Sequence, residues 1–185
     1  LSPSRLKFPG APHPRWWQIE DARVDIGGFP PDRSHFATML LVDADPQGSL
    51  SQGFLGSTTA ENLPASATLA SLFDEEFGFA DLHSLPQPTE FERISIVPSN
   101  QHLAQHNRPV PENEGMKQFA VRELLETITG YDVVLIDCPP NLYLCSWSAL
   151  LAADYVVIPV PPEDFGTQGL RVVHQAIEHA KTLNP

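Results

Sequence analysis

Three aspartates that directly follow apolar runs are the residues of this chain best suited to chemistry. Asp137 follows the apolar run Val133–Ile136, and Asp43 and Asp45 follow a second apolar run that ends at Val42. Ligands of open α/β sheets bind at the carboxyl ends of the strands, where a carboxylate can hold a hydrated Mg²⁺ or orient a water molecule. The alternative is that each aspartate only caps or shapes the turn that follows it.

These aspartates can form one site only if the two strands that precede them end at the same edge of a sheet. Val133–Ile136 has four consecutive apolar residues without alternation, which is typical of a central parallel strand buried on both faces. Cys138-Pro139-Pro140 ends this strand, because proline has no amide hydrogen for the ladder. Thr38–Asp43 is predicted to be a second buried strand, and Ile94–Val97 a third that stops at Pro98.

The remaining periodicities predict helices that alternate with these strands. Apolar residues at helical spacing predict an amphipathic helix over Met116–Thr129, ended by Gly130, because glycine commonly terminates helices. The other expected elements are a short helix or turn at 68–73, a loop at 49–59, a loop at 108–115, a helix at 145–153, a strand at 155–160 and a helix at 166–183. This alternation predicts an α/β fold with a doubly wound, mostly parallel sheet flanked by helices. Right-handed crossovers would place Asp43, Asp137 and the loop at 161–163 at one sheet edge.

Composition limits the function classes. The 185 residues, 42% of them hydrophobic and 18% charged, suffice for one domain with a core. The net charge of −12 makes tight nucleic-acid binding unfavourable, although a local basic patch stays open. The acidic stretch between Asp74 and Glu92 is typical of a solvated surface. Cys138 and Cys145 are too few for a disulfide framework and favour a reducing, cytoplasmic setting. No segment is apolar enough to span a bilayer.

Residues 1–37 form a proline-rich segment for which no regular fold is predicted, and the domain core is expected to begin at residue 38. Gly27-Gly28 invites comparison with a phosphate-binding loop, which needs a lysine and a Ser or Thr after its glycines. Phe29-Pro30-Pro31 follows instead, and no lysine occurs between Lys7 and Lys117. We therefore interpret Gly27-Gly28 as a turn.

The segments VDADPQGSLSQGFLG and YDVVLIDCPPNLYLCSWSALLAADYVVIPV resemble the ParA/MinD-type deviant Walker ATPases, and within them the ParA (Soj-like) partitioning branch. Weaker similarity covers 96–104 and 159–170, so the resemblance spans roughly residues 38 to 185 in the family's order. It implies a P-loop NTPase-like fold, ATP and Mg²⁺ as ligands, and a homodimer that works with a DNA-bound ParB-like partner. Non-specific DNA would be contacted only weakly or indirectly, and no membrane is involved.

The resemblance also implies roles for individual residues. Asp45 and Asp43 would be catalytic, with Asp45 positioning the attacking water. Asp137 and Asp43 would serve the metal. Nucleotide contacts would come from the turn after the first strand and from a loop near the adenine, namely Gln47, Gly48, Pro161, Pro162 and Glu163.

Two features of the family are missing from this sequence. The family's K-G-G-x-G-K-[ST] loop, with its catalytic lysine, has no counterpart upstream of the VDADPQ segment, and the chain stops before the family's last strands and helices. We therefore expect a ParA-like ATPase domain for plasmid or chromosome partitioning, with weak or no hydrolysis by this chain alone. The alternatives are a non-catalytic pseudo-ATPase interaction module and a truncated gene fragment.

Overall fold

The computed structural model describes residues 38–75, 81–159 and 167–183. These residues fold around a four-stranded sheet. The strands are β1 (Met39–Asp43), β2 (Gln87–Pro88), β3 (Ile94–Val97) and β4 (Val133–Asp137), in the order β2-β3-β1-β4. β1 runs parallel to β3 and to β4, and only the short β2 is antiparallel, to β3. The mostly parallel sheet with flanking helices confirms the predicted fold class.

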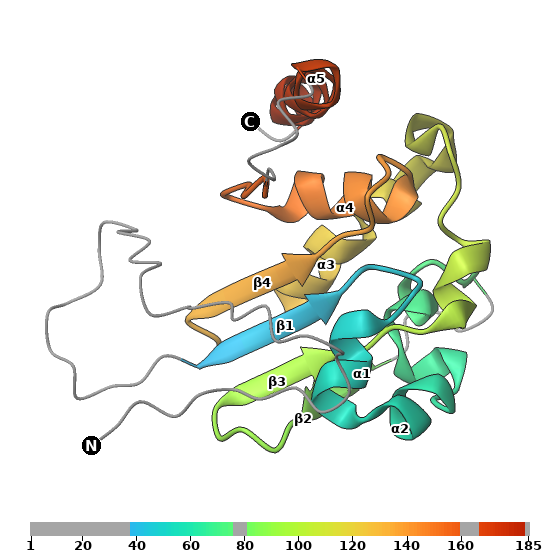
Figure 1. Cartoon of the computed structure of the whole chain (residues 1–185), viewed down its shortest axis with the longest axis vertical. Helices are drawn as coiled ribbons and strands as arrows, with labels where there is room; N and C mark the ends of the chain where they lie inside the picture. The colour runs from blue at the N-terminus through green and yellow to red at the C-terminus, as the bar shows by residue number, and fades with distance from the viewer. Residues whose placement is uncertain (1–37, 76–80, 160–166, 184–185) are drawn as a thin grey trace, which may run out of the picture. The chain divides into compact units, whose positions relative to one another are not determined.

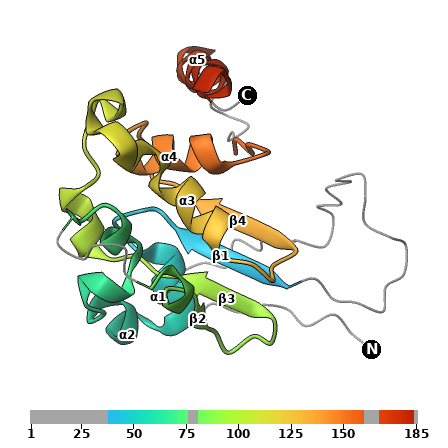
Figure 2. The ribbon, with the colours of Figure 1, turned by 180° about the vertical axis from the view of Figure 1, so that it is seen from behind.

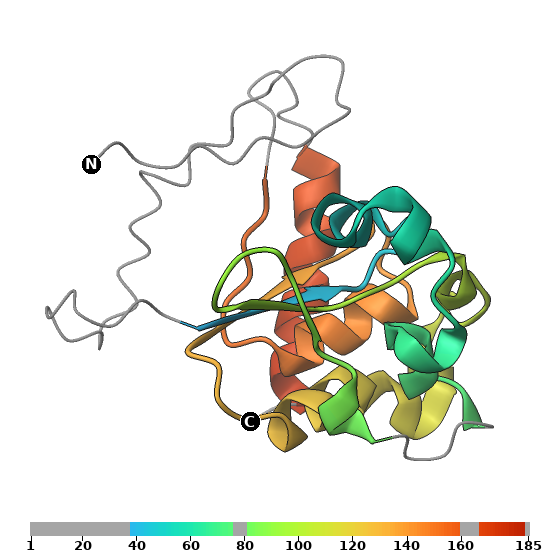
Figure 3. The same ribbon diagram turned by 90° about the horizontal axis from the view of Figure 1, so that it is seen from below.

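Helices lie on both faces of the sheet. α1 (Ser49–Leu55) and α2 (Ser57–Glu61) lie in front of the sheet in Figure 1, and α3 (Ala120–Thr127) lies on the opposite face, nearest the viewer in Figure 2. The view from below in Figure 3 separates the two layers, with α1 and α2 in teal and α3 in yellow. Short 3₁₀ helices fill the connections, namely η2 (Ala65–Ala67), η3 (Leu69–Leu72), η5 (Leu82–Ser84), η6 (Gln101–Gln105) and η7 (Pro111–Phe119).

The core forms where β1 meets α3 and the short helices. Leu40 and Val42 of β1 are fully buried and belong to one cluster with Phe73, Val121 and Leu124. The remaining helices are α4 (Leu144–Ala152) and α5 (Thr167–Leu183). They form a second cluster through Trp147, Leu151 and Ala180.

The structure corrects four sequence-based predictions of local structure. Residues 49–59 form α1 and α2 instead of a loop, because Asp43 accepts the Ser51 N–H within the first turn of α1 and Gly56 separates the two helices. The second correction concerns residues 111–119. They form η7, which is kinked at Gly115, in place of the end of the predicted loop and the start of the predicted helix, and α-helical structure begins at Ala120.

The two other corrections concern strands. β4 was predicted to be central and buried, but it is the last strand of the sheet among the described residues, and Leu135 is 51% exposed. Residues 155–159 form no strand, and Val157 is 84% exposed, because no described strand offers them a ladder. The predicted proline-rich segment 1–37 lies outside the described residues.

Candidate active site

The parallel register brings the aspartates together at the carboxyl edge of the sheet. Asp43 and Asp137 are direct partners in the ladder between β1 and β4. Just beyond them, the Ala44 N–H donates to the Asp137 carbonyl oxygen at 2.8 Å, so the two strand ends stay joined. Desolvation raises the pKa of Asp137, and the negative charge of Asp45 adds to this shift. The predicted meeting of Asp43 and Asp137 at one sheet edge is therefore present, and the loop at 161–163, predicted at the same edge, lies outside the described residues.

Asp43 is completely buried, and both of its carboxylate oxygens accept hydrogen bonds. Oδ1 accepts the Asp45 N–H at 3.1 Å, whereas Oδ2 accepts the Ser51 N–H at 2.8 Å and the Ser51 hydroxyl at 2.6 Å. Burial raises the pKa of Asp43, and these donors oppose that shift. In this arrangement Asp43 holds the turn after β1 and the start of α1 in place.

The turn after β1 places Asp45 and Gly48. The Asp45 side chain accepts the Gln47 N–H at 2.9 Å, and its carbonyl oxygen accepts the Gly48 N–H, also at 2.9 Å. Gly48 has φ +64°, and a Cβ built on it would lie 2.7 Å from the Ser99 carbonyl oxygen. Glycine is therefore required here for its backbone conformation and for the close approach of the loop after β3.

Asp137 is the exposed member of the group. Neighbouring protein atoms partly desolvate its carboxylate and raise its pKa, and the negative charge of Asp45 acts in the same direction. A divalent cation would relieve this repulsion. Mg²⁺ typically takes one or two protein carboxylates and completes its shell with water and phosphate oxygens, so an exposed Asp137 fits such an ion. No cluster of three or more His, Cys, Asp or Glu side chains that could hold a metal occurs within the described ranges.

Polar residues that sequence reasoning did not single out tie the loops together. Ser51 accepts the Ser99 N–H at 2.8 Å, which links the loops after β1 and β3. The Asn100 side chain donates to the carbonyl oxygens of Ala60 and Leu63 and accepts the His102 N–H. The signal for this link was the polar pair Ser99-Asn100, which follows the Ile94–Val97 strand after Pro98. The Ser99 hydroxyl is buried and has no hydrogen-bond partner among the described residues.

The loop after β4 and the start of α4 are held by hydrogen bonds from Asn107 and Arg108. Asn107 Oδ1 accepts the Cys145 N–H at the start of α4 at 3.1 Å, and Asn107 Nδ2 donates to Asn141 Oδ1 at 3.4 Å. The Arg108 carbonyl oxygen accepts the Leu144 N–H at 3.0 Å. Since the helix N-cap Tyr143 has no side-chain capping bond of its own, Asn107 supplies the cap from another element. Nothing in the sequence spacing pointed to Asn107.

Both cysteines are free thiols, with Cys138 exposed and Cys145 buried. Neighbouring atoms desolvate the Cys138 sulfur, and together with the charges of Asp137 and Asp45 this raises the pKa of Cys138 to about 11. Burial likewise raises the pKa of Cys145 to about 12. Neither thiol is therefore poised as a nucleophile at neutral pH.

The predicted site residues are thus only partly placed. Asp43 and Asp137 are the last residues of β1 and β4, and Asp45, Gln47 and Gly48 lie in the turn after β1. The predicted adenine-side residues Pro161, Pro162 and Glu163 lie outside the described residues. The catalytic and metal-binding roles assigned from the sequence stay predictions.

Comparison with known proteins identifies the family. A family model described as "AAA domain" matches residues 34–185. The chromosome partitioning protein ParA of Myxococcus xanthus is 33% identical over 148 residues, which are 79% of this chain and 50% of that protein. The ParA protein of Caulobacter vibrioides is 32% identical over 152 residues, 80% of this chain and 54% of that protein. The chain belongs to the ParA/Soj-type ATPase family.

The fold agrees with this family assignment. Cobyrinic acid a,c-diamide synthase from Mycobacterium smegmatis, solved with bound ADP and magnesium, superimposes with a TM-score of 0.66 at 25% identity and covers 80% of this chain and 57% of the synthase. The chain spans about half the length of the curated relatives that it matches. No helix within the described ranges is long and apolar enough to cross a membrane.

Proposed function

We propose that residues 38–185 form the core of a Mg²⁺- and ATP-binding domain of a partitioning ATPase that acts on plasmid or chromosomal DNA. The observation that carries this proposal is the pairing of Asp43 with Asp137, with Asp45 two residues beyond, at the carboxyl edge of a parallel sheet. Family membership and the ADP- and magnesium-bound synthase support the choice of ligand.

Each aspartate has a separate proposed task. Asp137, which is exposed, binds the magnesium ion or its water shell. Asp45, which is half-buried in the turn, orients the attacking water. Asp43, whose oxygens both accept protein hydrogen bonds, acts on the metal and the water through the turn that it fixes. Bound magnesium would neutralise charge that develops on the phosphate oxygens.

The remaining predicted residues would surround the nucleotide. Gln47 and Gly48 lie in the turn that would face the phosphates, and Pro161, Pro162 and Glu163 would approach the adenine. Phosphoryl transfer depends mainly on positioning and on cations that bind phosphate. Because no lysine occurs between Lys7 and Lys117, we propose that this chain alone hydrolyses ATP weakly or not at all.

We propose that the native assembly is an ATP-dependent homodimer in the cytoplasm that works with a DNA-bound ParB-like protein. The net charge of −12 argues that DNA is contacted weakly or through that partner. The same lack of lysines favours a second candidate, a pseudo-ATPase module that keeps the sheet and its partner surface without turnover.

Thermal unfolding with and without Mg-ATP distinguishes these candidates. A ligand that binds only the folded state adds about 2.7 kcal/mol at a hundredfold excess over Kd, and we expect the melting temperature to rise accordingly. Asp137→Ala should abolish the rise, whereas Asp154→Ala, which removes another exposed carboxylate at the far end of α4, should keep it. ATP with a chelator serves as the metal control.

The other outcomes are equally informative. Cooperative melting with no response to Mg-ATP would refute nucleotide binding by this chain and support the pseudo-ATPase module. Absence of a cooperative transition would support a truncated fragment that does not fold alone. A rise that survives in Asp137→Ala would refute the proposed role of Asp137.

A further inference from the structure

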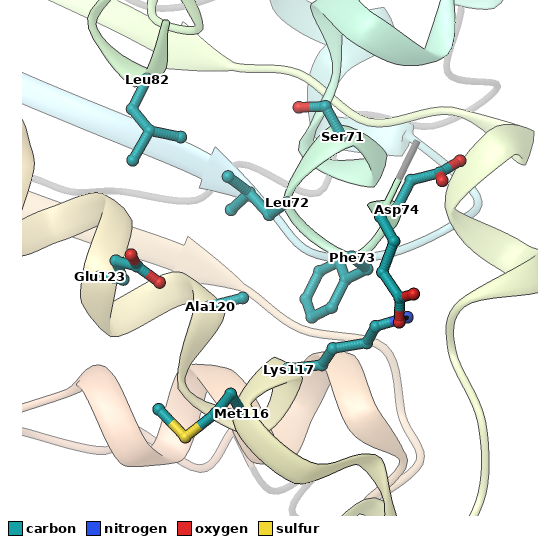
Figure 4. Close-up of a pocket in the computed structure, with 10 residues that line it drawn as sticks. Ser71, Leu72, Phe73, Asp74, Leu82, Met116, Lys117, Ala120 and Glu123 are labelled. Carbon is teal, nitrogen blue, oxygen red and sulfur yellow. Dashed lines mark ion pairs between the residues drawn. The ribbon is translucent and has the colours of Figure 1, made fainter. Parts of the chain in front are cut away.

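A cavity is lined by residues other than the three aspartates. It has a volume of about 290 Å³ and is bounded by residues of η3, η5 and the segment where η7 meets α3. Figure 4 shows Leu72 and Phe73 from one segment across from Met116 and Ala120 from another. Small-molecule sites usually measure about 300–1,000 Å³, so this cavity suits one or two apolar side chains better than a whole cofactor.

The edge of the cavity is acidic. Asp74, Glu75 and Glu123 line it, against one cation, Lys117. Lys117 Nζ lies 3.1 Å from Glu75 Oε1, and the Glu75 side chain is 87% exposed. Glu123 is exposed as well. Asp74 Oδ2 lies 3.9 Å from His106 Nε2. Three carboxylates and one lysine therefore line the cavity, and the exposed Glu123 belongs to neither of these two ion pairs.

The wall of the cavity includes one exposed apolar side chain. Met116 is 80% exposed. It directly follows Gly115, whose φ of 58° and ψ of −130° kink η7. Methionine is flexible and polarizable, which suits it to contact surfaces that adapt to a partner.

We propose that this cavity is a docking site for a segment of a partner protein in which an apolar side chain is flanked by lysines or arginines. The apolar walls would take the anchor side chain, and the carboxylates would pair with the flanking cations. An apolar centre with a polar edge is the usual anatomy of a protein interface. Acidic segments and nucleic-acid backbones would be repelled by the same edge.

Methionine NMR tests the proposal directly, because the chain contains only two methionines, Met39 and Met116. The chain is labelled with ¹³C at the methionine methyl groups and titrated with the peptide acetyl-Lys-Lys-Leu-Phe-Lys-Lys-amide. We expect the Met116 resonance to shift saturably while the Met39 resonance, from β1, stays in place. Control peptides carry glutamate in place of every lysine, or serine in place of Leu and Phe, and should produce no saturable shift.

Two variants locate the site. Glu123→Lys turns an attraction into a repulsion at an exposed position, and we expect the peptide to bind about 2- to 30-fold more weakly. Ala120→Leu should also weaken binding by filling the cavity. Glu90→Lys, the same charge change in the exposed turn between β2 and β3, should leave the affinity unchanged.

The proposal is overturned if Met116 does not respond, if the acidic peptide is equally effective, or if Glu90→Lys weakens binding as much as Glu123→Lys. It also fails if the chain's own Phe77 or Phe79 occupies the cavity. In that event Phe77→Ser and Phe79→Ser would move the Met116 resonance and the peptide would not. The proposal is independent of nucleotide binding, so an absent response to Mg-ATP does not affect it.

Discussion

The contact between Gly48 and the loop after β3 yields a quantitative expectation for Gly48→Ala. Gly48 has φ +64°, in the left-handed region, where a residue with a Cβ is strained by about 1–2 kcal/mol. In addition, the new Cβ would lie 2.7 Å from the Ser99 carbonyl oxygen and 3.5 Å from Asn100 Cα. These are backbone atoms, so no side-chain rotation can relieve the clash.

The loop after β3 also resists displacement. The Ser99 N–H donates to Ser51 Oγ, and the Asn100 side chain is bonded to two carbonyl oxygens near the end of α2. Overpacking of this kind costs about 1–3 kcal/mol, so the variant should lose about 2–5 kcal/mol in total. For a domain of this size each kcal/mol corresponds to about 2–4 °C in Tm.

Gly130→Ala is the matched control, because Gly130 has φ +95° and no heavy atom lies within 4 Å of the position that a Cβ would take there. Urea unfolding followed by circular dichroism should show Gly48→Ala to be less stable than Gly130→Ala by about 1–3 kcal/mol, the share that belongs to the clash with Ser99. Equal losses in the two variants would refute the reasoning. The turn after β1 would then tolerate a side chain, and its packing on Ser99 would not fix the position of Asp45.

Two further expectations concern ionisation. Burial raises the pKa of Asp43 in the folded chain. Between pH about 4 and this raised pKa, the folded chain keeps a proton on Asp43 that the unfolded chain has released, so the free energy of unfolding falls as pH rises through this window. Asp43→Asn removes this contribution, and unfolding free energies should show the variant gaining on the wild type as pH rises; a relative loss would contradict this. The second expectation follows from the pKa of Cys138, which is raised to about 11. Mass spectrometry should find that Cys138 is alkylated slowly at pH 8 and about tenfold faster for each added pH unit, while the buried Cys145 stays unmodified in the folded chain. Fast alkylation of Cys138 at pH 8 would contradict this expectation.

The sequence was sufficient for the features that depend on local patterns. The strands at 39–43, 94–97 and 133–137 follow from short apolar runs that end at acids or proline. The meeting of Asp43 with Asp137 follows from the rule that parallel strands share a carboxyl edge. The helices at 144–152 and 167–183 lie within about two residues of their predicted bounds, because their apolar periodicity is long enough to be unambiguous.

The rest depends on tertiary contacts that no short segment encodes. The position of β4 at the end of the described sheet is set by its neighbours, although its four apolar residues are typical of a central strand. α1 forms in a segment rich in Ser and Gly because the buried Asp43 carboxylate accepts two hydrogen bonds from Ser51. Likewise, Asn107 caps α4 through the N–H of Cys145, 38 positions later in the chain, a partnership that spacing rules do not describe.

The central position of β1 has a consequence for folding during synthesis on the ribosome. β1 precedes the other described strands in the chain, yet both of its partners come later, and its contact with the β4 side spans 94 positions. At about 5–20 residues per second, roughly 5–20 s pass between the appearance of β1 and that of β4. During that time the edge of β1 that pairs with β4 has no partner from the described strands, and it is accessible to chaperones and to neighbouring nascent chains.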